Sequence, residues 1–432
     1  MLSNTIHRAD SKADRVPRAG LIDRLARRAV HAALDRLCIG ATEIRERDCH
    51  QAFGDPAAPS DQRAQVTIRD PRVYRAIAWS GLLGAGEAYT DGWWNCDDLT
   101  TLMRIFLQNE AVFDSLNSGF SRASSFAGRC LHALRRNTRR GSRRNIAAHY
   151  DLSNEFYRLF LDDTMTYSCG IFEHDGSSLR EASVAKLDRI CRKLRLSPDD
   201  HVIEIGSGWG SFAIHAAKTY GCRVTTTTIS EQQHAFARRR ISEAGMDGRV
   251  TLLRKDYRDL TGQYDKLVSI EMIEAVGWQY YDTFFRQCSR LLKPNGVACL
   301  QAIVMADRYY ENCRNAVDFI KRHIFPGSCI PSIGAMTCSI ARSTDLGVAH
   351  LEDITPHYAR TLRAWTERFR SNLPGIRDLC FSESFIRMWE YYLCYCEAGF
   401  LERTIGAVQM LMVKPNYRGT PPLGILSREG LA

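Results

Sequence analysis

The residues best suited to chemistry lie within residues 201–212, where an acidic side chain precedes three glycines. Glu204 stands two places before Gly206, and Gly208 and Gly210 follow at alternate positions. The apolar residues before the glycines predict a strand buried on both faces, and the pattern after them predicts a helix. A strand, a glycine turn and a helix form the first unit of a doubly wound sheet, which binds its ligand at the carboxyl ends of the strands.

The residues around the turn indicate which ligand it serves. A dinucleotide site usually has an apolar residue where Glu204 stands, and an acid at the tip of its second strand. The second strand predicted here, 223–229, has no acid at its tip, and no Gly-Lys-Ser/Thr follows the glycines. A nicotinamide site and a phosphate-cradling loop are therefore disfavoured. Glu204 suits a ligand with an ammonium group, and Glu-x-Gly-x-Gly-x-Gly is similar to motif I of S-adenosylmethionine (SAM) methyltransferases. A turn without a ligand is the alternative.

Composition limits the class of protein. The chain has 432 residues, of which 45% are hydrophobic and 25% charged, as in folded proteins of two or three domains. The net charge of +9 favours an anionic partner, either nucleic acid or an acidic membrane surface. Fifteen scattered cysteines and an N-terminus unlike a signal peptide predict free thiols in the cytoplasm. Since no apolar run approaches the ~20 residues that span a bilayer, membrane contact is expected to be peripheral, at the inner face.

Patterns along the chain predict three parts. Residues 1–125 predict a small α+β domain, 126–145 an arginine-rich linker, and 146–432 the domain that contains the glycine turn. In the last part strands alternate with helices, which predicts an α/β fold with a parallel sheet and right-handed crossovers. The segment 306–355 is too irregular for sheet core and is expected to cover the substrate.

Two basic segments have open interpretations. Residues 21–39 predict an amphipathic helix with arginines on one face, which either lies on anionic lipid or packs against the core with a solvated basic side. The arginines between residues 122 and 144 lack the interleaved aromatic residues of a nucleic-acid stacking surface. We therefore expect a linker that meets lipid phosphates, and no nucleic acid as partner.

Seven stretches between about residues 80 and 415 together resemble the cyclopropane-fatty-acyl-phospholipid synthase family, in the family's order. They are Gly-Glu-Ala-Tyr-Thr-Asp-Gly-Trp-Trp, His-Tyr-Asp-Leu-Ser-Asn-x-Phe-Tyr, Met-Thr-Tyr-Ser-Cys, Glu-Ile-Gly-Ser-Gly-Trp-Gly, Glu-Met-Ile-Glu-Ala-Val-Gly, Phe-Pro-Gly-x-x-x-Pro-Ser and Tyr-Tyr-Leu-x-x-Cys. The resemblance implies a class I SAM-methyltransferase fold, which is Rossmann-like, and SAM as the cofactor.

The resemblance also implies which residues hold SAM. The matching positions are Tyr167, Ser168, Glu204, Gly206, Gly208, Gly210, Thr228, Gln233 and Tyr257. Gln233 has a second interpretation, because Ser230-x-x-Gln233 has the form of a capping box that begins a helix.

Ring formation on an alkene needs a base, and members of the family are thought to use a bound bicarbonate. The resemblance places it among Cys169, the Ile270 carbonyl, Glu274, Gln301 and Tyr358, and it adds Cys396, long treated as catalytic in the family. Cys169 can instead be a small buried thiol, Tyr358 part of the core, and Cys396 a structural or product-gating thiol. Gln301 and Ala275 stand where better-known bacterial members have histidine, which weakens the prediction of ring closure.

The sequence therefore predicts a SAM-dependent enzyme that forms cyclopropane rings on unsaturated acyl chains of phospholipids, without a metal. Its expected partners are the surface of a bilayer with anionic lipids, and a second copy of the chain in a homodimer. A methyl- or methylene-branched product is the alternative on the same fold. A non-catalytic lipid- or nucleic-acid-binding protein is the alternative from another class.

Overall fold

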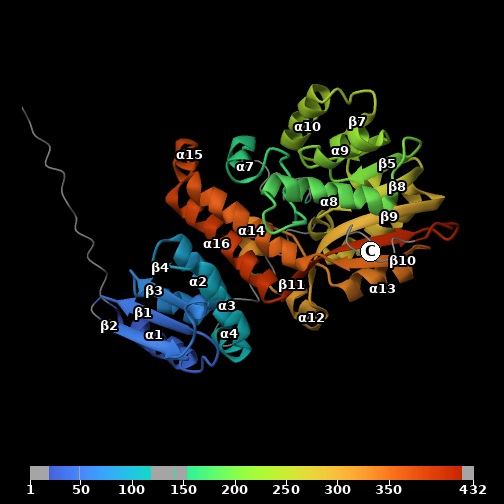
Figure 1. Ribbon diagram of the computed structural model, residues 1–432. Helices are drawn as coiled ribbons and strands as arrows, with labels where there is room; N and C mark the ends of the chain where they lie inside the picture. Colours follow the sequence, from blue (N-terminus) through green and yellow to red (C-terminus); the bar gives the residue numbers. More distant parts are fainter. Residues whose placement is uncertain (1–18, 48, 118–140, 142–152, 421–432) are drawn as a thin grey trace, which may run out of the picture.

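A computed structural model describes residues 19–47, 49–117, 141 and 153–420, which form an N-terminal unit and a larger α/β unit (Figure 1). Apart from Gly141, the linker predicted at 126–145 lies outside the described residues, as does the start of the His-Tyr-Asp-Leu-Ser-Asn stretch. None of the described helices combines the length and the apolar character needed to cross a membrane.

The N-terminal unit is a small sheet covered by helices. Its sheet has the strand order β2-β1-β3-β4, in which β1 pairs antiparallel with β2 and parallel with β3. The amphipathic helix predicted over residues 21–39 ends earlier, at Leu34, and buries Ala26, Val30 and Ala33. The elements are α1 (Leu21–Leu34), β1 (Ala41–Glu46), β2 (Cys49–Gly54), β3 (Arg63–Ile68), α2 (Arg72–Thr90), β4 (Trp94–Cys96), α3 (Leu99–Gln108) and α4 (Glu110–Asn117).

The larger unit contains a seven-stranded sheet of order β10-β11-β9-β8-β5-β6-β7. The pairs from β9 through β8, β5 and β6 to β7 are parallel, whereas β11 is antiparallel to both β9 and β10. The predicted α/β class is confirmed. The strands are β5 (His201–Ile205), β6 (Arg223–Thr227), β7 (Val250–Leu253), β8 (Tyr264–Ile270), β9 (Leu292–Met305), β10 (Gly347–Asp353) and β11 (Ile405–Val413).

The central strands are apolar throughout because both faces of the sheet are covered. Val202 belongs to the core beneath α8 (Leu179–Leu194), α9 (Ser211–Tyr220) and α10 (Glu231–Glu243). The next residue, Ile203, belongs to the core beneath α11 (Tyr281–Leu291) and α13 (Ile333–Ser343). Successive side chains point to opposite faces of a strand, so a strand between two helical layers needs apolar residues at every position.

The segment 306–355 corrects one sequence prediction. Its last part forms β10, which extends the sheet as an edge strand next to β11. The strand is half exposed and mixes polar with apolar residues, so it lacks the continuous apolar run by which the central strands were predicted. The earlier part is α12 (Asp307–Asn315), the short π-helix η5 (Ile320–Ile324) and the loop that follows it.

The strand order places a crevice between β5 and β8. The chain leaves β5 toward β6 on one side and reaches β8 on the other, so the carboxyl ends of β5 and β8 open into the gap where the strand order reverses. The strand β5 ends at Ile205, directly before Gly206, and β8 ends at Ile270, directly before Glu271. The fold thus brings two segments, far apart in the sequence, to one site.

The helix α16 (Glu383–Leu401) joins the two units, and it packs against α14 (Thr355–Ser371), which in turn contacts α7 (Asn154–Phe160). The N-terminal unit packs on α16. Tyr89 donates a hydrogen bond to Glu390 of this helix (3.0 Å), and Arg104 donates one to Glu402, the residue that caps its C-terminus (2.6 Å). Gly86 of α2 lies at this contact: a Cβ added there would come within 2.6 Å of the Phe319 ring and 2.9 Å of Tyr391.

Gly86→Val is therefore expected to push the N-terminal unit off its contact with α16 and η5. Overpacking of this kind costs about 1–3 kcal/mol, so the free energy of unfolding measured in urea should fall by that amount. Gly176→Val is the control, because nothing lies within 4 Å of a Cβ at Gly176. Equal stability of the two variants would contradict the described packing.

Candidate active site

A cavity of about 560 Å³ opens at the carboxyl ends of β5 and β8. One end is formed by the glycine turn after β5. The other has a mostly apolar wall that includes Phe325, Phe400 and Leu107, the last contributed by the N-terminal unit. Such a cavity can hold a polar cofactor at one end and an apolar substrate at the other.

The glycine turn has a backbone that only glycine adopts readily. Gly206, Gly208 and Gly210 have φ angles of 98°, 49° and 89°, in the left-handed region. Gly206 and Gly208 line the cavity, whereas Gly210 is the N-cap of α9. The three predicted glycines therefore divide into two that face a ligand and one that begins the helix.

Glu204 lies at the base of this turn, only 2% exposed. One carboxylate oxygen accepts a hydrogen bond from the Thr226 hydroxyl (2.5 Å), and the side chain lines the cavity. Burial raises the pKa of Glu204 to about 7. A buried acid whose charge is costly gains most from a cationic ligand, as expected of the acid that faces the ammonium group of SAM.

The other residues predicted for SAM line the same cavity. Thr228 donates to the Gln233 side-chain oxygen (2.9 Å), while the Ser230 hydroxyl accepts from the Gln233 backbone N–H (3.2 Å). Gln233 is the third residue of α10, which Ser230 caps, and its side chain also lines the cavity. A contact between Gln233 and SAM stays a prediction of the sequence. Tyr257 lines the cavity too, and burial raises its pKa.

Tyr167 and Ser168 approach the cavity from the loop that precedes α8. The Tyr167 and Tyr392 hydroxyls are 2.8 Å apart, and the Tyr167 ring lies 5.2 Å from that of Trp365. Ser168 accepts a hydrogen bond from the ammonium group of Lys186 (2.9 Å).

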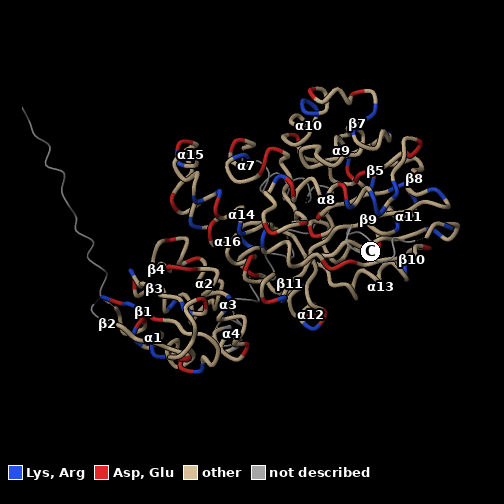
Figure 2. The backbone as a smooth tube through the Cα atoms, viewed as in Figure 1, with Lys and Arg blue, Asp and Glu red and all other residues tan. Residues whose placement is uncertain are grey.

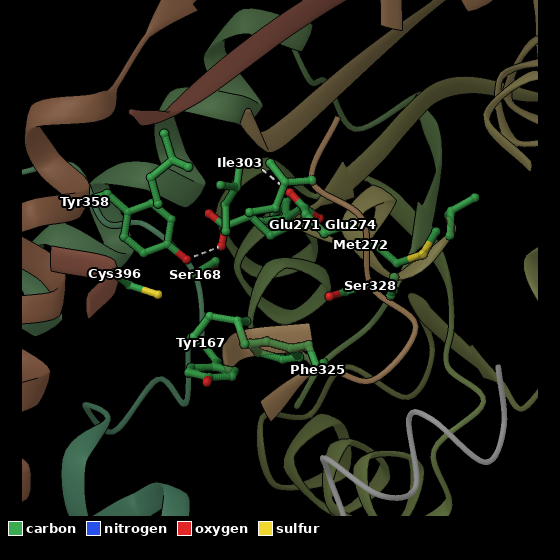
Figure 3. A pocket seen from close by; sticks show the side chains of 18 of the residues that line it. Tyr167, Ser168, Glu271, Met272, Glu274, Ile303, Phe325, Ser328, Tyr358 and Cys396 are labelled. Carbon is green, nitrogen blue, oxygen red and sulfur yellow. Dashed lines mark hydrogen bonds between the residues drawn. The ribbon is translucent and has the colours of Figure 1, made fainter. Parts of the chain in front are cut away.

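At the end of β8 the Glu271 carboxylate accepts three hydrogen bonds, and Figure 3 shows the one from Tyr358. One oxygen of Glu271 accepts from the Cys169 backbone N–H (2.9 Å) and from the Gln301 amide (2.8 Å). The other accepts from the Tyr358 hydroxyl (2.6 Å). The structure thus brings Cys169, Gln301 and Tyr358 together as predicted, but around Glu271 and not around Glu274.

The sequence interpretation missed Glu271, although it lies in the quoted Glu-Met-Ile-Glu-Ala-Val-Gly stretch. Its backbone φ is 49°, a left-handed value that costs energy for any residue other than glycine and that is typical of functional sites. Its position directly after a buried strand was the available indication, because ligand-binding side chains collect at strand tips. The Cys169 N–H, the Gln301 amide and the Tyr358 hydroxyl form a nest of three donors around Glu271. Because these donors already bind this side chain, the predicted bicarbonate does not fit in the nest.

Glu274 lies beside this cluster, one turn further along the chain. One oxygen accepts from the Ile303 backbone N–H (2.6 Å), and the other has no hydrogen-bond partner among the described residues. Burial, together with the charge of Glu271, raises the pKa of Glu274 to about 8. With three donors Glu271 holds the negative charge, so Glu274 is protonated at neutral pH and can donate its hydrogen into the cavity.

Lys186 is the second functional residue that the sequence interpretation missed. It lines the cavity and is 1% exposed, between the two acidic sites. Burial lowers its pKa to about 8, while the charges of Glu271 and Glu204 oppose that shift. A helical lysine among apolar residues gave no sequence indication of this position.

The remaining predicted residues differ in their access to the cavity. Cys169 is fully buried, its thiol donates to the Gly170 carbonyl (3.2 Å), and burial raises its pKa. Cys396 lines the cavity, and burial raises its pKa as well, so both sulfurs are neutral thiols. Neither is suited to act as a thiolate nucleophile. Ile270, the last residue of β8, lines the cavity.

Comparison with known proteins identifies the family. The family profile described as mycolic acid cyclopropane synthetase matches residues 137–410. The chain belongs to this family. A relative, tuberculostearic acid methyltransferase UfaA1 of Mycobacterium tuberculosis, is 36% identical over 83% of this chain and 84% of its own length. The cyclopropane-fatty-acyl-phospholipid synthase of Escherichia coli K12 is 36% identical over 82% of this chain and 88% of its own length.

Solved structures of the family agree with the fold. Mycolic acid cyclopropane synthase CmaA1, complexed with SAH and CTAB, superposes with a TM-score of 0.59 at 31% identity, over 63% of this chain and 98% of that one. The protein is a SAM-dependent methyltransferase of a cyclopropane synthase family that acts on lipid acyl chains. The predicted fold class is confirmed, and of the predicted cofactors SAM is confirmed.

SAM affinity is expected to depend on pH through Glu204. Its raised pKa means that the carboxylate is charged above about pH 7 and gains a proton below it, losing its attraction for an ammonium group. Calorimetry should find SAM bound about tenfold more weakly at pH 6 than at pH 8. Glu204→Gln should bind weakly at both values. A Glu204→Gln variant with the wild-type pH dependence would contradict this role.

Proposed function

We propose that this enzyme transfers a methylene from SAM to the cis double bond of unsaturated acyl chains in membrane phospholipids and closes a cyclopropane ring. The observation that carries the proposal is the Glu271 carboxylate, which faces a cavity shared by the SAM turn and a mostly apolar wall. A base beside an apolar pocket is what this reaction needs.

The reaction uses few protein groups. The π electrons of the alkene form a bond to the methyl carbon of SAM, the S–C electron pair stays with sulfur, and a carbocation remains on the acyl chain. Glu271 removes a proton from the transferred methyl group, and the released C–H pair forms the second bond of the ring. The proton ends on the Glu271 carboxylate, so charge and atoms balance.

Three features of the cavity support this role for Glu271. Glu271 and Tyr358 both line the cavity, and Figure 3 shows the Tyr358 hydroxyl directed at the Glu271 carboxylate. Met305, Ile320 and Phe325 contribute apolar surface suited to an acyl chain. The aromatic faces of Tyr167 and Tyr358 can stabilise a transient cation. A base built into the chain takes the place of the bicarbonate expected from the family.

Glu271→Gln should lower kcat by about 10²–10⁴-fold, since general-base catalysis contributes that much, and should leave SAM binding unchanged in calorimetry. Glu274→Gln is the matched comparison. It replaces a neutral acid by a neutral amide and is expected to retain far more activity.

Glu271→Ala should leave an empty nest with the Cys169 N–H, the Gln301 amide and the Tyr358 hydroxyl still in place. Added bicarbonate or formate is then expected to restore part of the activity to Glu271→Ala, and none to Glu271→Gln. Activity of Glu271→Gln at the wild-type level would overturn the role of this residue as the base.

A methyl- or methylene-branched product is the second candidate, favoured by the similarity to the tuberculostearic acid methyltransferase. Proton NMR of lipids from cells that express the protein separates the two. High-field cyclopropane protons with loss of the alkene support ring closure. A retained alkene or a saturated methyl branch supports the alternative.

Membrane binding is the last part of the proposal. In α1 the side chains of Leu21, Ile22 and Leu25 are 69%, 63% and 57% exposed, and Arg24 and Arg28 lie among them. Elsewhere the two signs of charge are mixed along both units (Figure 2). An exposed helix face with apolar residues and arginines suits the surface of an anionic bilayer. A homodimer stays a prediction of the sequence.

Replacing Leu21, Ile22 and Leu25 by serine should weaken sedimentation with phosphatidylglycerol vesicles about tenfold or more, because each apolar side chain loses its burial in lipid. Val348→Ser with Leu351→Ser is the control, since both side chains are exposed on β10. Equal vesicle binding by the two variants would argue against α1 as the contact.

A further inference from the structure

A chain of buried polar side chains leads from Glu271 through the sheet to a lysine in α8. Gln301 of β9 and Gln409 of β11 are cross-strand partners, and the Gln409 amide donates to the Gln301 side-chain oxygen (2.9 Å). The Lys193 ammonium donates to the Gln409 side-chain oxygen (2.7 Å). Gln301 and Gln409 are 0% exposed and Lys193 is 2% exposed.

The two ends of this chain fix its direction. A lysine ammonium has only hydrogens to donate, so Gln409 must turn its oxygen toward Lys193 and its NH₂ toward Gln301. Gln301 must then present its oxygen to Gln409 and its NH₂ to Glu271. An ionised carboxylate only accepts, so the other end demands the same orientation. If either side-chain amide rotated by a half turn, its oxygen would face another acceptor or its NH₂ group would face another donor.

The far end of the chain is held in turn by an ion pair. Lys193 lies 2.5 Å from a Glu352 oxygen, and Arg189 contacts the same carboxylate. Although burial opposes it, hydrogen bonds from Arg189 and Lys193 hold the pKa of Glu352 at about 2. Lys193 therefore keeps a fixed partner, and the glutamine pair keeps its direction.

We propose that Lys193 and Gln409 are positioning residues that keep Gln301 turned as a permanent donor to the base Glu271. This inference rests on the proposed function of Glu271. It also accounts for a glutamine at position 301. Gln409 and Lys193 fix the orientation of this amide, so its NH₂ always donates to Glu271. A histidine at this position could change its tautomer and its charge, and further groups would be needed to fix both.

The arrangement bears on the charge of Glu271. Burial raises its pKa, and the hydrogen bonds of Tyr358 and Gln301 oppose that shift. The other titratable groups around it are Glu274, Cys169 and Lys186. Loss of the Gln301 donor should therefore protonate Glu271 at higher pH, while these neighbours stay in place.

Gln409→Glu is the sharpest test, because it keeps the size of the side chain and gives Lys193 a carboxylate partner. It also reverses the chain: Gln301 must donate to the new carboxylate and turn its oxygen toward Glu271 and the Cys169 carbonyl, which its NH₂ contacts at 3.3 Å. We expect kcat to fall about tenfold or more. The acid limb of the pH–kcat profile should move upward by about one unit, with KM for SAM unchanged.

Lys193→Met provides a second variant in case Gln409→Glu does not fold. It removes the donor that sets the direction, and it should shift the same limb in the same sense by a smaller amount. Gln287→Glu is the control: Gln287 is buried and donates to the Leu260 carbonyl (2.8 Å), so this change should lower stability without moving the limb.

The outcomes separate the two proposals. If Glu271→Gln abolishes turnover but Gln409→Glu and Lys193→Met keep the wild-type pH profile, the positioning role is wrong and the base remains. If Glu271→Gln is fully active, the proposed base is wrong, whatever the other variants do. A shift of the acid limb in Gln409→Glu and not in Gln287→Glu supports the positioning role.

Discussion

The structure of the active site depends on the cost of placing a negative charge beside an apolar cavity. An ionised carboxylate removed from water loses on the order of several kcal/mol unless donors replace its hydration. Glu271 receives three such hydrogen bonds, from segments before β5, in β9 and in α14. Each donor lies in a different part of the chain. The charge on Glu271 is therefore stabilised only when the loop that carries Cys169, the strand β9 and the helix α14 are all in place.

The same constraint orders the neighbouring groups. Two carboxyl groups as close as Glu271 and Glu274 do not both ionise readily in a buried site, and the one with fewer donors takes the proton. The ammonium group of Lys186 offsets part of the negative charge of Glu271. Its hydrogen bond to Ser168 connects it to the loop that carries Tyr167. A charged base, a neutral acid and a buried cation thus face one cavity, each in a protonation state that its surroundings select.

The parts of the fold and of the site that depend on neighbouring residues in the chain could be predicted from the sequence. The glycine turn, Glu204 and the central strands follow from short-range patterns, and their positions agree with the structure. The resemblance to a family placed Cys169, Gln301 and Tyr358 in one site, and the structure brings these three residues together around Glu271. It named Glu274 and did not name Glu271, since a spacing of three residues does not show which of the two acids accepts hydrogen bonds from these groups.

Other features depend on partners that are distant in the sequence. The edge strand β10 lacks an apolar run because one side of it meets solvent, so only its pairing with β11 reveals it. Gln409 and Lys193 look like ordinary polar residues of a strand and a helix. Their importance appears only when the register of β9 and β11 places Gln409 opposite Gln301.

In the reaction that we propose, the base belongs to the polypeptide. The most direct measurement is the turnover of the wild-type enzyme in buffer stripped of carbon dioxide and bicarbonate, followed by the return of bicarbonate. The same rate is expected in both conditions, because Glu271 already occupies the nest. A rate that falls on removal of bicarbonate and recovers on its return would contradict it.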